Sequence, residues 1–282
     1  MRTFAHIINP VIVPRESSLF IAQPITFETV RTAQEYSRCL VQVDLFSAQY
    51  PEDKSFVPEG FHLTKNLTQS VFEFGNFQEK RRLPLIKDIL DRLYEATDAD
   101  YMIYTNVDIA LMPFFYIVVN RIIESGYDAF VINRRTISKT FERPEDIPLM
   151  YSQVGEKHRG YDCFVFKRSA YPEYQLGNTC IGTGRIGAVL AVNLIYNAKQ
   201  FKEFTDLHVT FHIGNDKVWK SRKLNEYLLY NENELKKVLQ YYDVLQNPLD
   251  YEFIKKMVVQ FGKYSIKEKV LRKFLRWRKK QG

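Results

Sequence analysis

The sequence has few cysteines and no long apolar run. Its three cysteines, Cys39, Cys163 and Cys180, are odd in number, far apart and without CxxC spacing, which argues against a disulfide-rich scaffold and a CxxC metal site. No apolar run reaches the roughly 18 residues of a membrane-spanning helix. Residues 1–14 are interrupted by polar side chains and a proline, unlike the core of a signal peptide. We therefore expect a reduced, cytoplasmic protein.

The formal net charge of +7 is concentrated in one segment. Residues 263–280 hold nine Lys or Arg against Glu268 alone, a net +8, which leaves −1 for the rest of the chain. A nearly neutral body lacks the electrostatic basis for binding nucleic acid, so we expect no nucleic-acid partner.

The basic segment also carries apolar residues at helical spacing, which predicts a helix with one apolar stripe. These residues are Ile266, Val270, Leu271, Phe274, Leu275 and Trp277. Such a helix can lie on an anionic membrane, which would make the protein peripheral on the inner face of a membrane. Alternatively, it docks on the body of the protein with a solvated basic end.

The length of 282 residues fits one large domain, or a domain with an appendage, and the 45% apolar content predicts a folded globule. The chain opens with a predicted strand within Phe4–Val13, a helix over Thr26–Leu40 with Thr26 as its N-cap, and a strand over Val41–Ser47. Apolar residues at helical spacing predict a further helix over Leu83–Ala96. This order is typical of an α/β sheet.

A complete β-α-β unit is predicted between residues 101 and 133. Tyr101–Tyr104 has the composition of a buried strand, Phe114–Ser125 that of a helix ending at Gly126, and Ala129–Ile132 that of the next strand. We expect the two strands to lie side by side and parallel.

Asn106 and Asp108 lie directly after the first strand of this unit. In an open α/β sheet, ligands bind beyond the carboxyl ends of the strands. A carboxylate and an amide oxygen placed there suit Mg²⁺ or Mn²⁺, which prefer oxygen ligands and bridge substrate phosphates. The structural alternative is that Asp108 caps the following helix.

The segment Thr105-Asn-Val-Asp108-Ile, between a strand and a helix, resembles the DxD metal motif of GT-A-fold glycosyltransferases, with Asn106 in place of the first Asp. The resemblance implies a GT-A-like α/β fold: a mixed, mostly parallel sheet flanked by helices, with a C-terminal helical extension. It implies a catalytic domain over residues 1–220 and the extension over residues 221–282. It also implies a divalent cation, Mn²⁺ or Mg²⁺, held against the diphosphate of a nucleotide-sugar donor.

Two further residues become candidates through the same resemblance. Asp162 begins the apolar strand predicted over Tyr161–Phe166, where a partly desolvated carboxylate could take a proton from an acceptor hydroxyl, as an Asp or Glu does in inverting enzymes of the family. His212 precedes Gly214-Asn-Asp216 on the alternating segment Leu207–Ile213 and would be an additional metal ligand. A turn-forming or Arg-paired Asp162 and a structural His212 are the alternatives.

Three features remain less specific. Asn133, Arg134 and Arg135 end a predicted strand and suit a diphosphate or an acidic sugar, or a salt bridge to a nearby acid. Four glycines between 177 and 187 match neither a P-loop nor a convincing dinucleotide site. Residues 138–159 are predicted to form a long loop, either a lid over the site or an insertion.

The resemblance to GT-A enzymes, taken with these features, implies a metal-dependent glycosyltransferase. We expect it to move a sugar from a nucleotide-diphosphate donor to a hydroxyl of a glycan or lipid-linked acceptor, in the synthesis of a surface polysaccharide or glycolipid. A sugar nucleotidyltransferase is one alternative, although residues 1–30 contain no glycine for its usual phosphate loop. A non-catalytic protein that binds glycans or membrane surfaces is the other.

Overall fold

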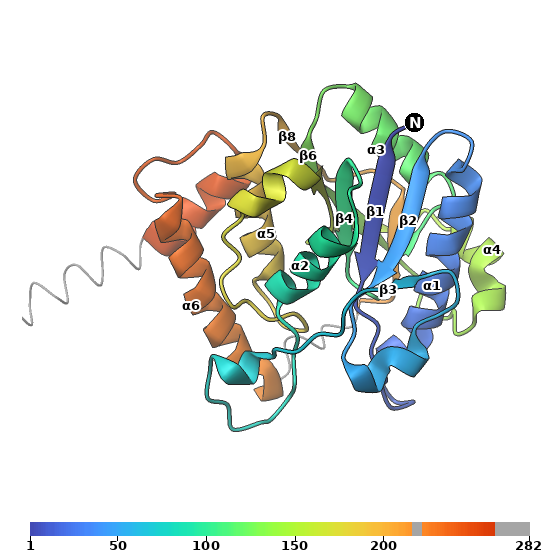
Figure 1. Cartoon of the computed structure of the whole chain (residues 1–282), viewed down its shortest axis with the longest axis horizontal. Coiled ribbons are helices and arrows are strands. Elements are labelled where there is room, and N and C mark those ends of the chain that lie inside the picture. Colours follow the sequence, from blue (N-terminus) through green and yellow to red (C-terminus); the bar gives the residue numbers. More distant parts are fainter. Residues whose placement is uncertain (216–221, 263–282) are drawn as a thin grey trace, which may run out of the picture.

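The computed structural model describes residues 1–215 and 222–262 and shows a central sheet with helices on both faces (Figure 1). The described residues form a nine-stranded sheet in the order β3-β2-β1-β4-β7-β6-β9-β5, with β8 also paired to β6. The strands are β1 (Thr3–Ile8), β2 (Gln42–Ser47), β3 (His62–Leu63), β4 (Tyr101–Thr105), β5 (Ala110–Leu111), β6 (Ala129–Ile137), β7 (Glu156–Lys167), β8 (Phe201–Phe204) and β9 (Thr210–Ile213).

The sheet is mixed and mostly parallel, as predicted. Strands β3, β2, β1 and β4 pair in parallel with one another in that order, and β6 pairs in parallel with β8 and β9. Strand β7 runs antiparallel to both β4 and β6, and β5 runs antiparallel to β9. The carboxyl ends of β1, β2 and β4 therefore share one edge of the sheet with the amino-terminal half of β7.

Helices bury the two faces of the sheet because successive strand side chains point to opposite faces. Met102 and Tyr104 pack in one core cluster with residues of α2, α5 and α6, whereas Tyr101 and Ile103 pack in another with residues of α1 and α3. The helices are α1 (Ser18–Ser37), α2 (Ile86–Ala96), α3 (Phe115–Glu124), α4 (Ile147–Tyr151), α5 (Ile186–Asn197) and α6 (Asn225–Tyr241).

The predicted C-terminal helical extension is present in its described part. Helix α6 and the helical residues 252–262 follow the sheet in the chain. Leu235 and Ile254 are fully buried in the same core cluster as α2 and α5, so these helices complete one face of the sheet. The basic segment 263–280, with its predicted amphipathic helix, lies outside the described residues.

Helix α1 begins at Ser18, so the prediction of a helix start at Thr26 is wrong. Ser17 is the N-cap and accepts a hydrogen bond from the N–H of Leu19. The side-chain amide of Gln23 exchanges two hydrogen bonds of 2.9 Å with the backbone of Val11. This long-range contact holds the first turns in place although Pro24 lies inside the helix.

The prediction that β4 and β6 lie side by side is also wrong, because β7 lies between them. Residues 138–159 are not one long loop. They contain α4 and the first part of β7, whose pairing with β6 extends to Thr136 and Glu156. The polar run at 156–160 shows no apolar alternation because it lies outside the core, and only the pairing with β6 makes it a strand.

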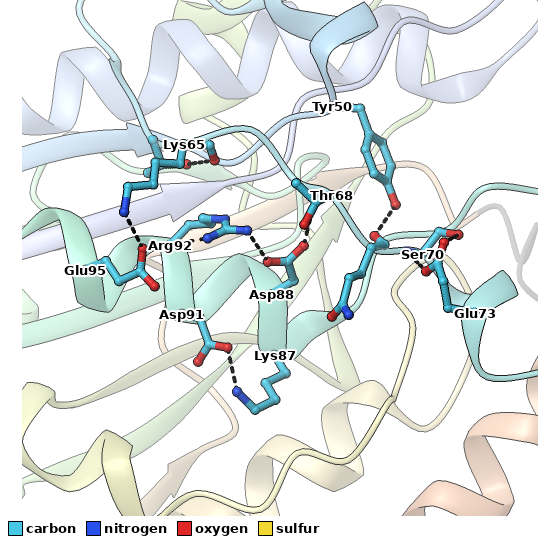
Figure 2. Close-up of polar contacts among 12 residues, drawn as sticks. Tyr50, Lys65, Thr68, Ser70, Glu73, Lys87, Asp88, Asp91, Arg92 and Glu95 are labelled. Atoms are coloured by element: carbon cyan, nitrogen blue, oxygen red, sulfur yellow. Dashed lines mark hydrogen bonds and ion pairs between the residues drawn. The ribbon is translucent and has the colours of Figure 1, made fainter.

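The segment after β3 is tied to α2 by polar contacts (Figure 2). Asp88 on α2 accepts from the N–H of Thr68 at 3.4 Å and pairs with Arg92 at 3.1 Å. The hydroxyl of Tyr50 donates to the carbonyl of Gln69 at 2.8 Å. Asp88 is buried and the side chain of Arg92 is 16% exposed, so this ion pair within the helix is largely shielded from solvent.

His6 sits in the core at the centre of β1. Its Nδ1 lies 2.7 Å from the hydroxyl of Tyr116 and its Nε2 lies 2.9 Å from Oγ1 of Thr105. Burial lowers the pKa of His6 to about 3. The ring is therefore neutral in the folded protein, and it links β1 to the end of β4 and to α3.

We predict that His6 makes the fold sensitive to acid. The unfolded chain binds a proton at His6 near pH 6.5, and the folded protein does so only near pH 3. The stability of the folded protein that depends on a neutral His6 is therefore fully present above pH 6.5 and is lost as the pH falls toward 3. The contribution amounts to about 1.4 kcal/mol per pH unit within that window. Urea unfolding at pH 7, 6 and 5 should show a shallower pH dependence for His6→Gln than for the wild type; equal slopes would contradict the assignment.

Candidate functional site

Four of the predicted residues gather beyond the carboxyl end of β4. Asn106 and Asp108 follow β4 directly, Asp162 comes from β7, and His212 comes from β9. The register explains the meeting: Thr105 pairs with Cys163 across β4 and β7, while Ala110 pairs with Phe211 across β5 and β9.

Asp108 and His212 form the most informative contact. Oδ2 of Asp108 lies 3.2 Å from Nε2 of His212, and Nδ1 of His212 lies 2.8 Å from the carbonyl oxygen of Gly214. A carbonyl oxygen only accepts, so Nδ1 carries a proton, and in the neutral ring Nε2 then presents a lone pair to the carboxylate. The contact therefore requires a positive charge between the two atoms, either a second proton on His212 or a cation.

The chemistry of this pair fits a divalent cation: the carboxylate of Asp108 suits Mg²⁺ or Mn²⁺, and the imidazole of His212 suits ions softer than Mg²⁺. Histidines that bind metals commonly donate their other ring N–H to a carbonyl, as His212 does to Gly214. Neighbouring donors in an octahedral Mg²⁺ shell lie about 3 Å apart, close to the 3.2 Å seen here. Oδ1 of Asp108 is buried without a hydrogen-bond partner among the described residues.

The pair alone does not complete a metal shell. In residues 1–215 and 222–262, no group of three His, Cys, Asp or Glu side chains could hold a metal ion. A cation on Asp108 and His212 would need further ligands from substrate phosphates and water, which is usual for Mg²⁺. Asp216, grouped with His212 in the sequence, lies outside the described residues.

Neighbouring charges keep Asp108 ionised. Burial alone would raise the pKa of Asp108, but the hydrogen bond to His212 and the charges of His212 and Arg134 outweigh it and hold the pKa below its ordinary value. An ionised carboxylate is the form that binds a cation.

Asp162 is the extra residue of a β-bulge. The pairing of β6 with β7 passes from Ile132 and Cys163 to Asn133 and Tyr161, so Asp162 has no counterpart across the strands. Bulges near functional sites re-aim a side chain. Asp162 is 7% exposed, and its Oδ1 lies 3.0 Å from Nη1 of Arg134.

Asn106 connects two of its neighbours. The hydroxyl of Tyr104 donates to Oδ1 of Asn106 at 3.1 Å, and Nδ2 of Asn106 donates to Oδ1 of Asp162 at 3.4 Å. Both the oxygen and the nitrogen of the Asn106 amide therefore form hydrogen bonds, and neither is directed to the contact between Asp108 and His212.

Of the three residues predicted to bind the donor, Arg134 contacts another candidate, Asp162. Asn133 donates to Glu203 on β8 at 2.9 Å. Arg135 pairs with Asp206 at 2.7 Å and donates to the backbone carbonyls of residues 154 and 155. A contact of Asn133 or Arg135 with a donor stays a prediction.

Sequence reasoning missed His158 as a neighbour of the site. Its Nδ1 accepts from the N–H of Gly160 at 2.9 Å and lies 3.7 Å from Oδ2 of Asp162. His158 belongs to the polar run that was assigned to a loop, and no periodicity in that run indicated a strand. It could be found only through the pairing of β7 with β6.

Comparison with known proteins identifies the fold. No family model matches the chain, and no curated protein matches its sequence. Among solved structures, the chain is similar to S. aureus TarS 1-349 in complex with UDP, at 8% identity and a TM-score of 0.54, covering 93% of this chain and 70% of TarS 1-349. The complex of TarS 1-349 with UDP-GlcNAc matches with a TM-score of 0.53 at the same 8% identity, covering 93% and 71%.

An identity of 8% over 93% of the chain is a likeness of fold and not of sequence. The mixed, mostly parallel sheet and the helices on both faces agree with the architecture that the resemblance of the segment around Asp108 implied. The chain has the GT-A fold.

Proposed function

We propose that this protein is a glycosyltransferase that moves a sugar from a nucleotide-diphosphate donor to a hydroxyl acceptor. The GT-A fold supports the proposal, as does the position of the candidate residues beyond the carboxyl ends of the strands, where such sheets bind ligands. Structures of TarS with UDP and UDP-GlcNAc make UDP-sugars the first donors to test.

The observation that carries the proposal is the contact between Asp108 and His212. We assign these two residues to a divalent cation, Mn²⁺ or Mg²⁺, because their donor atoms face each other at 3.2 Å and His212 is oriented by Gly214. A cation bound there supplies positive charge to a diphosphate leaving group.

We assign Asp162 as the general base and Arg134 as its counter-ion. Asp162 is held by Arg134 through Oδ1, and its Oδ2 has no hydrogen-bond partner among the described residues. If the reaction inverts the configuration of the sugar, this buried oxygen would take the proton from an acceptor hydroxyl bound against it. The ion pair fixes the orientation of the carboxylate.

The acceptor is proposed to be a glycan or a lipid-linked glycan, in the synthesis of a surface polysaccharide or glycolipid. The basic residues of segment 263–280 support a peripheral location on an anionic membrane, because each is worth about 1 kcal/mol near such a surface. Within the described ranges 1–215 and 222–262, no helix has the length and apolar character needed to cross a membrane.

A thermal-shift screen tests the donor. UDP-, GDP-, CMP- and dTDP-linked sugars are added with Mn²⁺ or with EDTA, since a ligand that binds only the folded state raises its melting temperature. We expect a metal-dependent shift with one nucleotide, and with UDP-GlcNAc before the others. No shift with any of these ligands would favour a protein that binds glycans or membranes without catalysis. The nucleotidyltransferase alternative is tested separately, by adding a nucleotide triphosphate together with a sugar phosphate.

Asp108→Ala should abolish the metal-dependent shift and reduce turnover to background, because it removes the charged ligand. The fold should persist, since the side chain of Asp108 is 26% exposed and at the edge of the sheet. Isothermal titration with Mn²⁺ provides a readout that does not depend on turnover. Full Mn²⁺ affinity in the variant would exclude Asp108 as a ligand.

Asp162→Asn should leave the donor-induced shift intact and lower kcat by about 10²-fold to 10⁴-fold, the usual contribution of a general base. The matched control is Asp88→Asn, because Asp88 is also 7% exposed and pairs with an arginine at a similar distance, 3.1 Å against 3.0 Å. Both variants should lose stability, and only Asp162→Asn should lose turnover. Wild-type kcat at neutral pH in Asp162→Asn would refute the assignment.

A further inference from the structure

The two ends of the Asn106 amide can be assigned from the chemistry of its partners. An ionised Asp162 only accepts hydrogen bonds, so the NH₂ group of Asn106 must face it, at 3.4 Å from Oδ1. The oxygen of Asn106 then faces the hydroxyl of Tyr104, which donates to it at 3.1 Å. The one atom of Asn106 that could bind a cation is thus directed to a buried hydroxyl.

The same contact gives a physical reason for asparagine in the first position of the motif. An aspartate at this position would place a second carboxylate within hydrogen-bond distance of Oδ1 of Asp162, and like charges at this separation repel. Asparagine has nearly the same shape and supplies a donor instead. The amide therefore complements Asp162.

Asn106 and Arg134 together define the orientation of Asp162. Both contact Oδ1, at 3.4 Å and 3.0 Å, from β4 and β6 on either side of β7. Oδ2 is left without a hydrogen-bond partner among the described residues, and Nδ1 of His158 lies beyond hydrogen-bond distance at 3.7 Å. Two donors on one oxygen prevent rotation of the carboxylate and keep the other oxygen in a single position.

We infer that Asn106 is a positioning residue that aims Asp162 and is not a ligand of the cation. This inference rests on the proposed function, in which Asp162 takes the acceptor proton. It replaces the role that the motif alone predicts for Asn106, and it leaves Asp108 and His212 as the protein ligands of the cation.

Asn106→Asp separates the two roles because they predict opposite results. If Asn106 is a ligand of the cation, the substitution restores both carboxylates of the motif, so Mn²⁺ affinity and turnover would be kept or improved. If Asn106 is a positioning residue, the substitution replaces a donor with a repelling carboxylate, and we expect kcat to fall about 10²-fold, the effect of misplacing a reacting group by about 1 Å. The KM for the donor should change less than about threefold, since binding of the donor does not depend on the aim of Asp162.

Asn106→Ala gives a second test that adds no charge. Titration with Mn²⁺ in the presence of saturating UDP, whose diphosphate would supply further ligands, should give the wild-type Mn²⁺ affinity in Asn106→Ala and no Mn²⁺ binding in Asp108→Ala. A tenfold or greater loss of Mn²⁺ affinity in Asn106→Ala, or full turnover in Asn106→Asp, would overturn the inference.

The double variant Asn106→Asp, Asp162→Asn separates folding from catalysis. It removes the repulsion between two facing carboxylates, so its melting temperature should recover relative to Asn106→Asp. Its turnover should stay low, because the carboxylate is no longer at position 162. Recovery of turnover would also overturn the inference. If the wild type turns over no nucleotide sugar, the proposed function fails, and the Mn²⁺ affinity of Asn106→Ala alone decides whether Asn106 is a ligand.

Discussion

The insertion of β7 as an antiparallel strand between β4 and β6 is the constraint on which the candidate site depends. It places Cys163 opposite both Thr105 and Ile132, so that Asp162 lies between the end of β4 and Arg134 on β6. If β4 and β6 were direct neighbours, no strand would bring Asp162 to the contact with Asn106. The bulge in the pairing of β6 with β7 then turns Asp162 toward the site.

The positive charge of Arg134 offsets the negative charges of Asp108 and Asp162, which lie in the same site. Asp108 and Asp162 are both close enough to Tyr104 to raise the pKa of its hydroxyl, although burial is the larger cause. Arg134 contacts Asp162 and also lowers the pKa of Asp108, so one guanidinium serves both carboxylates. Each acid retains one oxygen without a hydrogen-bond partner among the described residues, Oδ1 of Asp108 and Oδ2 of Asp162. In the proposed function, these two buried oxygens are the atoms that would bind the cation and take the proton.

The sequence predicted much of the framework because its strongest signals are local. The buried strand at Tyr101–Tyr104 and the helix ending at Gly126 were found from composition and periodicity, and Gly126 has the positive φ of 100° that a helix-ending glycine adopts. The start of helix α1 and the first half of β7 were misassigned, because the amide of Gln23 on Val11 and the pairing of β7 with β6 are contacts between distant residues. Helix α5 was not predicted at all, since it is apolar on all sides and shows no stripe.

What the sequence determined by itself was the class of fold and the position of Asn106 and Asp108 after a buried strand. These follow from side-chain character along a few adjacent residues, which fixes a strand, its end and the helix after it. Only the tertiary structure decided which residues face each other: His212 with Asp108, Arg134 with Asp162, and Asn106 between Tyr104 and Asp162. The reason is that strand order, register and the bulge are set by packing of the whole sheet, and they decide which distant side chains meet at its edge.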